Sequence, residues 1–356
     1  MEHQLSGIRM QSPIIIGSGP LSYGAPGLIR LHQAGAGAVV TKTINLLAAK
    51  NPVPHIAGCG ANTLVNCEKW SDYSPEQWIK SEIPAAKQEG VVVIASVGAS
   101  AVEQPEIVAS LVRAGADMVE LVSYTEADLP QMVKVLRSYC SVPMFAKLSS
   151  NYGDFLGVAH SCNEYGCDGF TACDSIGPAI KIDIETGRPV LGDADGRGWL
   201  SGAAIKPLIL HRVLELRQEF DCPIIGLGGI TAWEDCIEFS MAGANAFGIC
   251  SAPMLQGVQA IKKLDQGIVS YLQSHNHQDI NEICGLTARH LLAKEQPEPY
   301  HMGFQSERCT ACRRCVTVCP YAARALGGDK EMHVDHAICR SCGLCVSVCP
   351  GKCLKV

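Results

Sequence analysis

The C-terminal stretch 309–320, CTACRRCVTVCP, repeats its cysteine spacing at 339–350, CRSCGLCVSVCP. Each stretch reads Cys-x2-Cys-x2-Cys-x3-Cys-Pro, and together they contain eight of the chain's 19 cysteines. Three thiolates at this spacing bind one face of a [4Fe-4S] cubane, and the fourth cysteine of each run binds the other cluster. The repeat therefore predicts a small domain that transfers single electrons through two clusters.

The crossed pattern assigns a ligand set to each cluster. One cluster should be bound by Cys309, Cys312, Cys315 and Cys349, and the other by Cys339, Cys342, Cys345 and Cys319. A pair of zinc ribbons and a disulfide framework are the alternatives. Zinc sites need no Cys-Pro closure, and disulfides do not persist in a reducing cytosol. We therefore expect a bacterial-type 2[4Fe-4S] ferredoxin domain, and we interpret most of the other, scattered cysteines as small buried hydrophobic residues.

Size and charge restrict the remaining possibilities. A chain of 356 residues is long enough for one large domain and a small appendage. Its net charge of -6 and the lack of a Lys/Arg-rich run argue against nucleic acid as a partner. The N-terminus does not resemble a signal peptide, and apolar stretches such as 91–102 are shorter than the roughly 20 residues of a membrane span. We expect a cytoplasmic protein without a membrane span.

Short apolar runs rich in β-forming residues alternate with helical patterns along the first 290 or so residues. These runs are Ile14–Ile16, Ala38–Val40, Val91–Ile94, Met118–Leu121, Met144–Ala146, Gly169–Thr171, Ile224–Gly226 and Ala246–Ile249. Eight strands with helices between them predict an α/β fold, a (β/α)8 TIM barrel.

Two connections of the predicted barrel are long, at about residues 44–90 and 174–204. Long loops on the C-terminal face of a barrel usually cover a site. A Pro/Glu-rich linker at 295–299 marks the domain boundary. We therefore predict a barrel over residues 1–295 and the ferredoxin domain over 296–356.

The ends of the last two predicted strands suggest a phosphate site. Gly228 and Gly229 end the seventh strand, and Cys250 and Ser251 end the eighth. Barrels bind phosphate groups on these two loops, where glycines let backbone N–H groups approach the ligand. A Gly-Gly pair alone also fits an ordinary tight turn, but its combination with the eighth-strand loop favours the phosphate site.

A series of short motifs then points to a family. They are Ser18-Gly19-Pro20-Leu21, Val40-Thr41-Lys42-Thr43, Asn51-Pro52-Val53-Pro54, Ala146-Lys147-Leu148-Ser149, Ile182-Asp183-Ile184-Glu185, Arg188-Pro189-Val190-Leu191, Leu200-Ser201-Gly202, Ala204-Ile205-Lys206-Pro207 and Gly228-Gly229-Ile230. In this order they resemble the FMN barrel of dihydroorotate dehydrogenases. With the cysteine repeat, the chain from about residue 8 to its end resembles the FMN and iron-sulfur part of dihydropyrimidine dehydrogenase.

The resemblance implies an FMN site. Its residues would be Ser18, Gly19, Lys42, Thr43, Lys147, Ser201, Gly202, Gly228, Gly229, Cys250 and Ser251. Lys42 matches the lysine beside the N1/O2 edge of the flavin, whose charge stabilises the anionic reduced form. Lys147 matches the fifth-strand lysine that contacts the cofactor. Either lysine could instead be a surface or ion-paired residue, but lysines at barrel strand ends usually face the site.

The loop after the fourth strand departs from the family pattern. Family members place a Cys or Ser there that exchanges a proton with the substrate, and this chain has Thr125 at the matching position. Thr125, Tyr124 and Glu126 are the candidate catalytic residues, because a phenol or carboxylate could act as the acid or base if the loop bends differently. The alternative is that the loop only binds.

The substrate contacts depart as well. Asp174 and Ser175 replace the family's Asn-Thr pair after the sixth strand, and of the family's substrate-facing asparagines the resemblance retains only Asn62. An ionised Asp only accepts hydrogen bonds, whereas an amide also donates. We expect Asn62, Asp174 and Ser175 to bind a cationic or N–H-rich substrate rather than uracil or orotate.

Two functions fit these features. The first is an FMN- and iron-sulfur-dependent oxidoreductase that acts on a C–C bond of a small polar, nitrogen-containing substrate. The second is an electron-transfer subunit of a larger flavoprotein complex, without substrate chemistry. Because no complete Gly-x-Gly-x-x-Gly motif lies in a βαβ context, NAD(P)H should bind a separate FAD-containing subunit, or a soluble ferredoxin should deliver electrons. We expect a homo- or hetero-oligomer.

Overall fold

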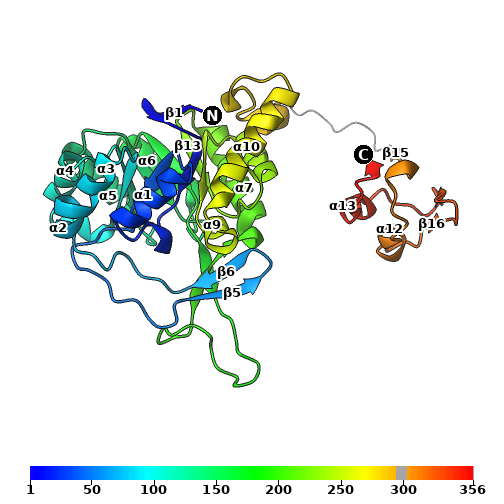
Figure 1. Cartoon of the computed structure of the whole chain (residues 1–356), viewed down its shortest axis with the longest axis horizontal. Coiled ribbons are helices and arrows are strands. Elements are labelled where there is room, and N and C mark those ends of the chain that lie inside the picture. Colours follow the sequence, from blue (N-terminus) through cyan, green and yellow to red (C-terminus); the bar gives the residue numbers. More distant parts are fainter. Residues whose placement is uncertain (294–302, 356) are drawn as a thin grey trace. The chain divides into compact units, whose positions relative to one another are not determined.

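The computed structural model describes residues 1–293 and 303–355. The chain divides into two compact units, Met1–Leu292 and Ala293–Val356, each with its own apolar core (Figure 1). The predicted linker at 295–299, and with it the predicted boundary between residues 295 and 296, lies outside the described residues.

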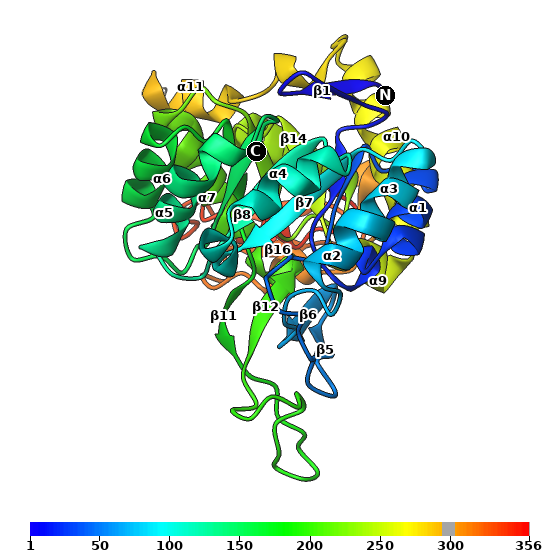
Figure 2. The same cartoon turned by 90° about the vertical axis from the view of Figure 1, so that its left-hand side faces the viewer.

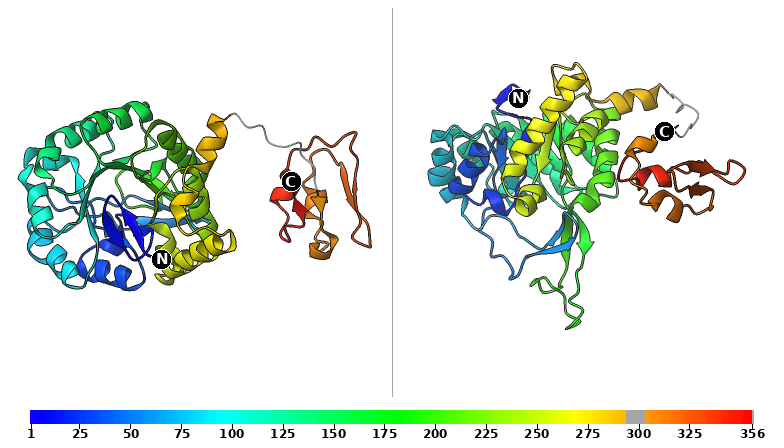
Figure 3. Two further views of the ribbon diagram at one scale, coloured as in Figure 1. Left: turned by 90° about the horizontal axis from the view of Figure 1, so that it is seen from above. Right: turned by 45° about the vertical axis from the view of Figure 1, so that its right-hand side comes forward.

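Eight parallel strands of the first unit close into a barrel, which Figure 3 shows end-on at the left. They are β3 (Ile14–Ile16), β4 (Ala38–Val40), β7 (Val93–Gly98), β8 (Met118–Val122), β9 (Met144–Leu148), β10 (Gly169–Ala172), β13 (Ile224–Leu227) and β14 (Ala246–Ile249). Their order is β10-β13-β14-β3-β4-β7-β8-β9, and pairing of β9 with β10 closes the ring. Each predicted run contributes one strand, so the (β/α)8 prediction is confirmed.

Helices surround the strands and cover their outer face (Figure 3). The longer ones are α1 (Ala25–Gln33), α3 (Ile83–Gln88), α4 (Glu106–Arg113), α5 (Asp128–Leu136), α6 (Phe155–Glu164), α7 (Lys206–Glu219), α8 (Trp233–Ala242) and α10 (Gln259–Ser274). The unit also contains the helices α2 (Pro75–Gln77), α9 (Ser251–Gln256) and α11 (Leu286–Leu292). Across the described residues, no helix has both the length and the apolar character needed to span a membrane.

Apolar side chains fill one end of the barrel interior. Residues from every barrel strand except β10, such as Ile94, Met118 and Phe145, form one buried cluster. Leu5 and Met10 belong to the same cluster and come from the antiparallel hairpin of β1 (His3–Leu5) and β2 (Ile8–Met10). The hairpin therefore closes the N-terminal end of the barrel, where it lies across the ring in Figure 3.

Two residues further along β7, β8 and β9, the side chains that point into the barrel are polar. Ser96 follows Ile94, Glu120 follows Met118 and Lys147 follows Phe145, and all three polar side chains are buried. Side chains two apart on a strand point the same way, so the interior changes from apolar to charged toward the C-terminal ends of the strands. Active sites of this fold lie at that end.

The two long connections pair with each other. The hairpin of β5 (Ile56–Gly60) and β6 (Thr63–Asn66) comes from the first, and β11 (Ile176–Ala179) and β12 (Gly198–Gly202) come from the second. They form an antiparallel sheet in the order β11-β12-β6-β5. This sheet projects from the end of the barrel opposite β1 (Figure 2), so both connections lie at the C-terminal mouth.

The second unit is an internal repeat. Each half carries one short helix, α12 (Arg314–Thr317) or α13 (Leu344–Ser347). Two small antiparallel pairs complete it, β15 (Gly303–Phe304) with β18 (Leu354–Lys355) and β16 (Arg324–Leu326) with β17 (Met332–Val334). Non-glycine residues with positive φ occur at equivalent positions, Ala311 with Ser341 and Ala322 with Lys352. The repeated cysteine spacing therefore corresponds to a repeated backbone.

Candidate active site

A cavity of about 1210 Å³ opens at the C-terminal mouth of the barrel. Single-ligand pockets usually measure roughly 300–1,000 Å³, so this cavity has room for a cofactor and a second small molecule. Of the predicted barrel site residues, those lining it are Ser18, Gly19, Lys42, Thr43, Tyr124, Thr125, Lys147, Asp174, Ser175, Ser201, Gly202, Gly228, Gly229, Cys250 and Ser251. The tertiary fold thus brings strand ends and both long connections to one place.

Two predicted residues do not line the cavity, and they require correction. Asn62 is exposed in the β5–β6 turn with a φ of 50°, and its carbonyl accepts the N–H of Ala203 at 2.8 Å. Asn tolerates this backbone conformation better than most residues, so Asn62 acts as a turn residue. The Glu126 carboxylate accepts the backbone N–H of Gly153, and Glu126 is not among the residues that line the cavity.

A charged network forms the floor of the cavity. The Lys147 ammonium lies 3.4 Å from Asp174 Oδ2 and 4.0 Å from Glu120 Oε1. Burial alone would lower the pKa of Lys147, but the two carboxylates outweigh it and raise this pKa above its ordinary value. Burial raises the pKa of Glu120, which also accepts a 2.8 Å hydrogen bond from Thr171. Lys147 is therefore a permanently charged, fixed group, and Asp174 is its ion-pair partner.

Lys42 is also buried and ion-paired. Its ammonium lies 2.8 Å from Glu68 Oε1 and donates to the carbonyl oxygen of Lys69 at 2.8 Å. Lys69 in turn pairs with Asp193 across the two long connections at 3.1 Å. Three lysines of the cavity are thus neutralised by neighbouring carboxylates.

Carboxylates outnumber cations in the cavity lining as a whole. The cationic residues are Lys42, Lys69, Lys147 and Arg197, and the acidic ones are Glu68, Glu103, Asp128, Asp174, Asp193 and Asp195. Arg197 is exposed, and within the described residues it is the only one of the four cations outside these ion pairs. The surplus of negative charge disfavours an anionic substrate.

Glycines shape the side of the cavity where the phosphate was predicted. Gly229 has a φ of 86°, and a Cβ there would lie 2.6 Å from the backbone N of Lys206. Gly202, with a φ of 90°, would place a Cβ 2.1 Å from the carbonyl oxygen of Asn62. Gly19 would collide with the Cys250 sulfur, at 2.6 Å. Only glycine fits these positions, and the resulting surface of bare backbone suits a phosphate or a flat ring.

Tyr124 and Trp199 face each other at the opposite side. Their rings stack with centroids 5.1 Å apart and an interplanar angle of 20°. Tyr124 is 55% exposed, so its phenol is accessible, and the negative charge of Asp174 raises its pKa. Thr125 is exposed, and its N–H donates to Ser123 Oγ at 3.1 Å.

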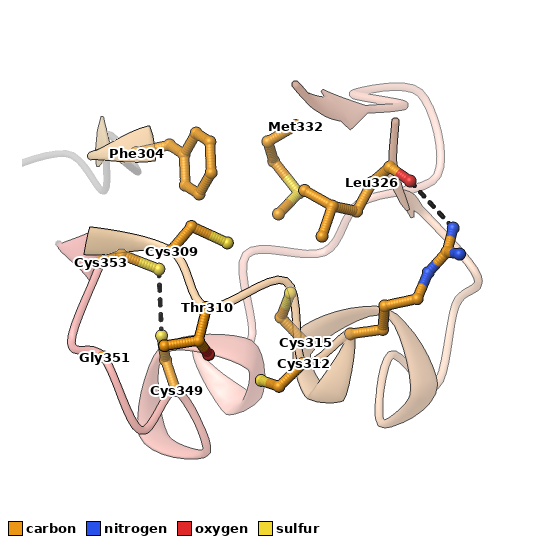
Figure 4. Close-up of a pocket in the computed structure, with 11 residues that line it drawn as sticks. Phe304, Cys309, Thr310, Cys312, Cys315, Leu326, Met332, Cys349, Gly351 and Cys353 are labelled. Carbon is orange, nitrogen blue, oxygen red and sulfur yellow. Dashed lines mark hydrogen bonds between the residues drawn. The ribbon is translucent and has the colours of Figure 1, made fainter. Parts of the chain in front are cut away.

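A second cavity lies within the C-terminal unit (Figure 4). Cys309, Cys312, Cys315 and Cys349 line it together, which is the ligand set predicted for one cluster. Thiolates are the ligands that [4Fe-4S] clusters use, so the donor chemistry of this cavity fits such a cluster.

Sequence comparison identifies the family of both units. A family model described as dihydroorotate dehydrogenase matches residues 1–272. The chain belongs to this family. A second model, described as a 4Fe-4S dicluster domain, matches residues 301–351, so the C-terminal unit is an iron-sulfur ferredoxin domain.

Similar proteins include catalytic subunits of dihydroorotate dehydrogenase B (NAD(+)). The protein of Methanothermobacter thermautotrophicus is 31% identical over 303 residues, covering 80% of this chain and 98% of the relative. The protein of Pyrococcus horikoshii is 32% identical, covering 81% of this chain and 98% of the relative. The protein of Methanocella arvoryzae is 33% identical, covering 80% of this chain and 96% of the relative. As a member of the dihydroorotate dehydrogenase family, the chain is an oxidoreductase that acts on CH–CH groups.

Reading the family motifs missed three residues of these sites. Asn66 lines the cavity, four residues beyond the predicted Asn62, and donates to the Trp199 carbonyl oxygen at 3.2 Å. Trp199 belongs to none of the family motifs. Cys353 lines the cysteine cavity, and its place four residues after Cys349 was a signal that could have been used.

Gly229→Ala should weaken retention of the FMN that the resemblance implies by about tenfold or more, equivalent to ~1.4 kcal/mol. The added methyl group would displace the Lys206 backbone beside the cavity. Gly187→Ala is the control, because Gly187 also has a positive φ, 68°, but has open space around it. Flavin content after dialysis measures the difference. If both variants retain FMN equally well, the glycines do not form the proposed phosphate site.

Proposed function

We propose that this chain is an FMN- and iron-sulfur-dependent oxidoreductase that adds two hydrogens to, or removes them from, a C–C bond of a small, N–H-bearing ring. Two [4Fe-4S] clusters connect the flavin to an electron partner, either an FAD- and NAD(P)H-binding subunit or a soluble ferredoxin. The observation that carries the proposal is the single cavity of a dihydroorotate dehydrogenase barrel, in which a fixed lysine, a glycine cradle and an accessible phenol converge.

The cavity suits FMN. Gly228, Gly229 and Ser251 would hold its phosphate at the ends of β13 and β14, and Lys147 would contact the cofactor from β9. Bound FMN supplies hydride transfer, which the side chains of the protein cannot perform. Lys147 is suited to oppose negative charge on a reduced ring, because its two carboxylate partners keep it protonated at all ordinary pH values.

The substrate end of the cavity favours a neutral or cationic ring with N–H donors. Asp174 accepts hydrogen bonds from Ser175 N, at 2.7 Å, and from its hydroxyl, while its other oxygen faces Lys147. Because a carboxylate only accepts, it complements substrate N–H groups. A substrate carboxylate would meet the surplus of acidic side chains and find only Arg197 outside an ion pair.

Tyr124 is the proposed proton donor. Of the three candidates on this loop, Tyr124 and Thr125 line the cavity, and a phenol is far more acidic than an aliphatic hydroxyl. The raised pKa keeps the Tyr124 phenol protonated at neutral pH, so the proton is present when substrate carbon needs it. Stacking on Trp199 holds the ring in place.

The loop's departure from the family pattern favours a second candidate, an electron-transfer subunit without substrate chemistry. In that case FMN and the clusters only relay electrons, and Tyr124 and Asp174 have no catalytic role. The two candidates differ in what the reduced flavin reacts with.

Purified under anaerobic conditions, the chain should contain about eight irons and one FMN. After photoreduction, the flavin should be reoxidised by at least one unsaturated nitrogen heterocycle from a panel that includes uracil and orotate. The panel without enzyme and the enzyme without heterocycle are the controls. If no heterocycle reoxidises the flavin while an artificial electron acceptor does, the electron-transfer subunit is the correct function.

Asp174→Asn should slow reaction with the preferred heterocycle by about tenfold or more, because the amide presents a donor where the carboxylate accepts. It should also tighten binding of orotate, since one negative charge is lost. Asp193→Asn removes the same charge from the cavity rim and should change both quantities by less than about twofold. Titration of flavin absorbance and stopped-flow reoxidation separate binding from reaction. If neither variant binds orotate more tightly than the wild type, the charge argument is wrong.

Tyr124→Phe should slow reoxidation by about 10²–10⁴-fold and leave heterocycle binding nearly unchanged, because the ring can still stack on Trp199. Thr125→Val, which also removes a hydroxyl, should have little effect. The wild-type rate should stay flat from pH 7 to about 10, since Asp174 raises the Tyr124 pKa above the ordinary value of about 10. A transition well below pH 10 would contradict Tyr124 as the proton donor.

A further inference from the structure

A ninth cysteine of the C-terminal unit lies beside the proposed cluster ligands. Cys353 is only 4% exposed, and its sulfur lies 3.2 Å from the sulfur of Cys349 (Figure 4). It lines the same cavity as Cys309, Cys312 and Cys315. Five cysteine sulfurs therefore surround a space in which one cubane uses four.

The internal repeat shows that this fifth sulfur is specific to one half of the unit. The position equivalent to Cys353, four residues after Cys319, is Ala323. Ala323 is equally buried, at 2% exposure, and its backbone N–H donates to Cys319 Sγ at 3.4 Å. The preceding residues, Ala322 and Lys352, both have positive φ. One place in the fold thus holds a methyl group in one half and a thiol in the other.

We propose that Cys353 is a reserve ligand, which can replace Cys349 at the cluster held by Cys309, Cys312 and Cys315. This inference rests on the proposed clusters. While Cys349 is bound to iron, Cys353 stays protonated and its thiol donates a hydrogen bond to the Cys349 sulfur. When Cys349 is lost, the Cys353 thiol releases its proton to solvent, and its thiolate forms the Fe–S bond that Cys349 made. No oxidation state changes in this exchange.

The separation of the two sulfurs supports ligand exchange rather than a disulfide. A disulfide has an S–S length of about 2.05 Å, whereas these sulfurs are 3.2 Å apart and not bonded. Because Cys353 follows Cys349 by only four residues and is buried toward the same cavity, its sulfur needs only a small local shift to reach the iron that Cys349 would bind.

Matched alanine variants of the two halves test the proposal. Cys349→Ala should keep about eight irons per chain, because Cys353 completes the site, and its reduced cluster should give an altered EPR spectrum. Cys319→Ala should fall to about four irons, because Ala323 offers no sulfur. The double variant Cys349→Ala/Cys353→Ala should also fall to about four. FMN content of each variant reports that the barrel remains folded.

A cysteine added to the other half of the unit tests the proposal by a gain of iron rather than by a loss of iron. Cys319→Ala combined with Ala323→Cys should recover iron that Cys319→Ala alone loses. If Cys349→Ala loses as much iron as Cys319→Ala, the reserve-ligand role of Cys353 is wrong. A wild-type chain without iron would instead overturn the proposed clusters themselves, so the two failures can be told apart.

Discussion

Closure of a parallel sheet into a ring is the constraint from which the active-site cavity follows. In a closed barrel every strand presents alternate side chains to one interior, and all strands run in the same direction. The residues two positions after the apolar layer of Ile94, Met118 and Phe145 must therefore meet at one end. At that end Ser96, Glu120 and Lys147 are polar and buried. Burial there is tolerated because these groups have partners, whereas an unpaired charge at the same depth would be costly.

The ion pairs of the cavity neutralise most of its positive charge. Lys147 shares two carboxylates, and Lys42 and Lys69 have one each, so little positive charge is left to attract an anion. The catalytic subunits that this chain resembles are named for dihydroorotate, a carboxylated ring. The same family barrel can therefore be adapted to another substrate by changing residues at the strand ends, while the cradle at Gly228 and Gly229 is kept. A shared fold allows such a change because chemistry depends on the site rather than on the scaffold.

The ferredoxin unit shows how a sequence repeat can conceal a difference in chemistry. Its two halves match in cysteine spacing and in the positions of residues with positive φ. At one of the buried positions that differ between them, Cys353 of the second half corresponds to Ala323 of the first. A sulfur beside a cluster ligand changes the hydrogen bonding around the cluster, which is one of the factors that set its potential. The two proposed clusters therefore need not be equivalent.

The sequence by itself determined the barrel, the ferredoxin unit and a set of strand-end residues that line the cavity. These features depend on local patterns, namely eight β-rich runs, a repeated cysteine spacing and family motifs at strand ends. Closing the sheet then brings residues such as Lys42, Lys147 and Gly229 together, because strand ends of a barrel have only one place to meet.

Only the tertiary structure decided the contacts made by the long connections and by the last residues of the chain. Asn66 contacts Trp199, 133 residues away, and Tyr124 stacks on the same tryptophan. These contacts depend on how β6 pairs with β12, and a register shift of one residue would turn the opposite side chains toward the cavity. Asn62 and Asn66 could not be distinguished by motif, and Cys353 looked like another buried thiol. The strand register and the packing of distant segments position these side chains, and a local sequence pattern predicts neither.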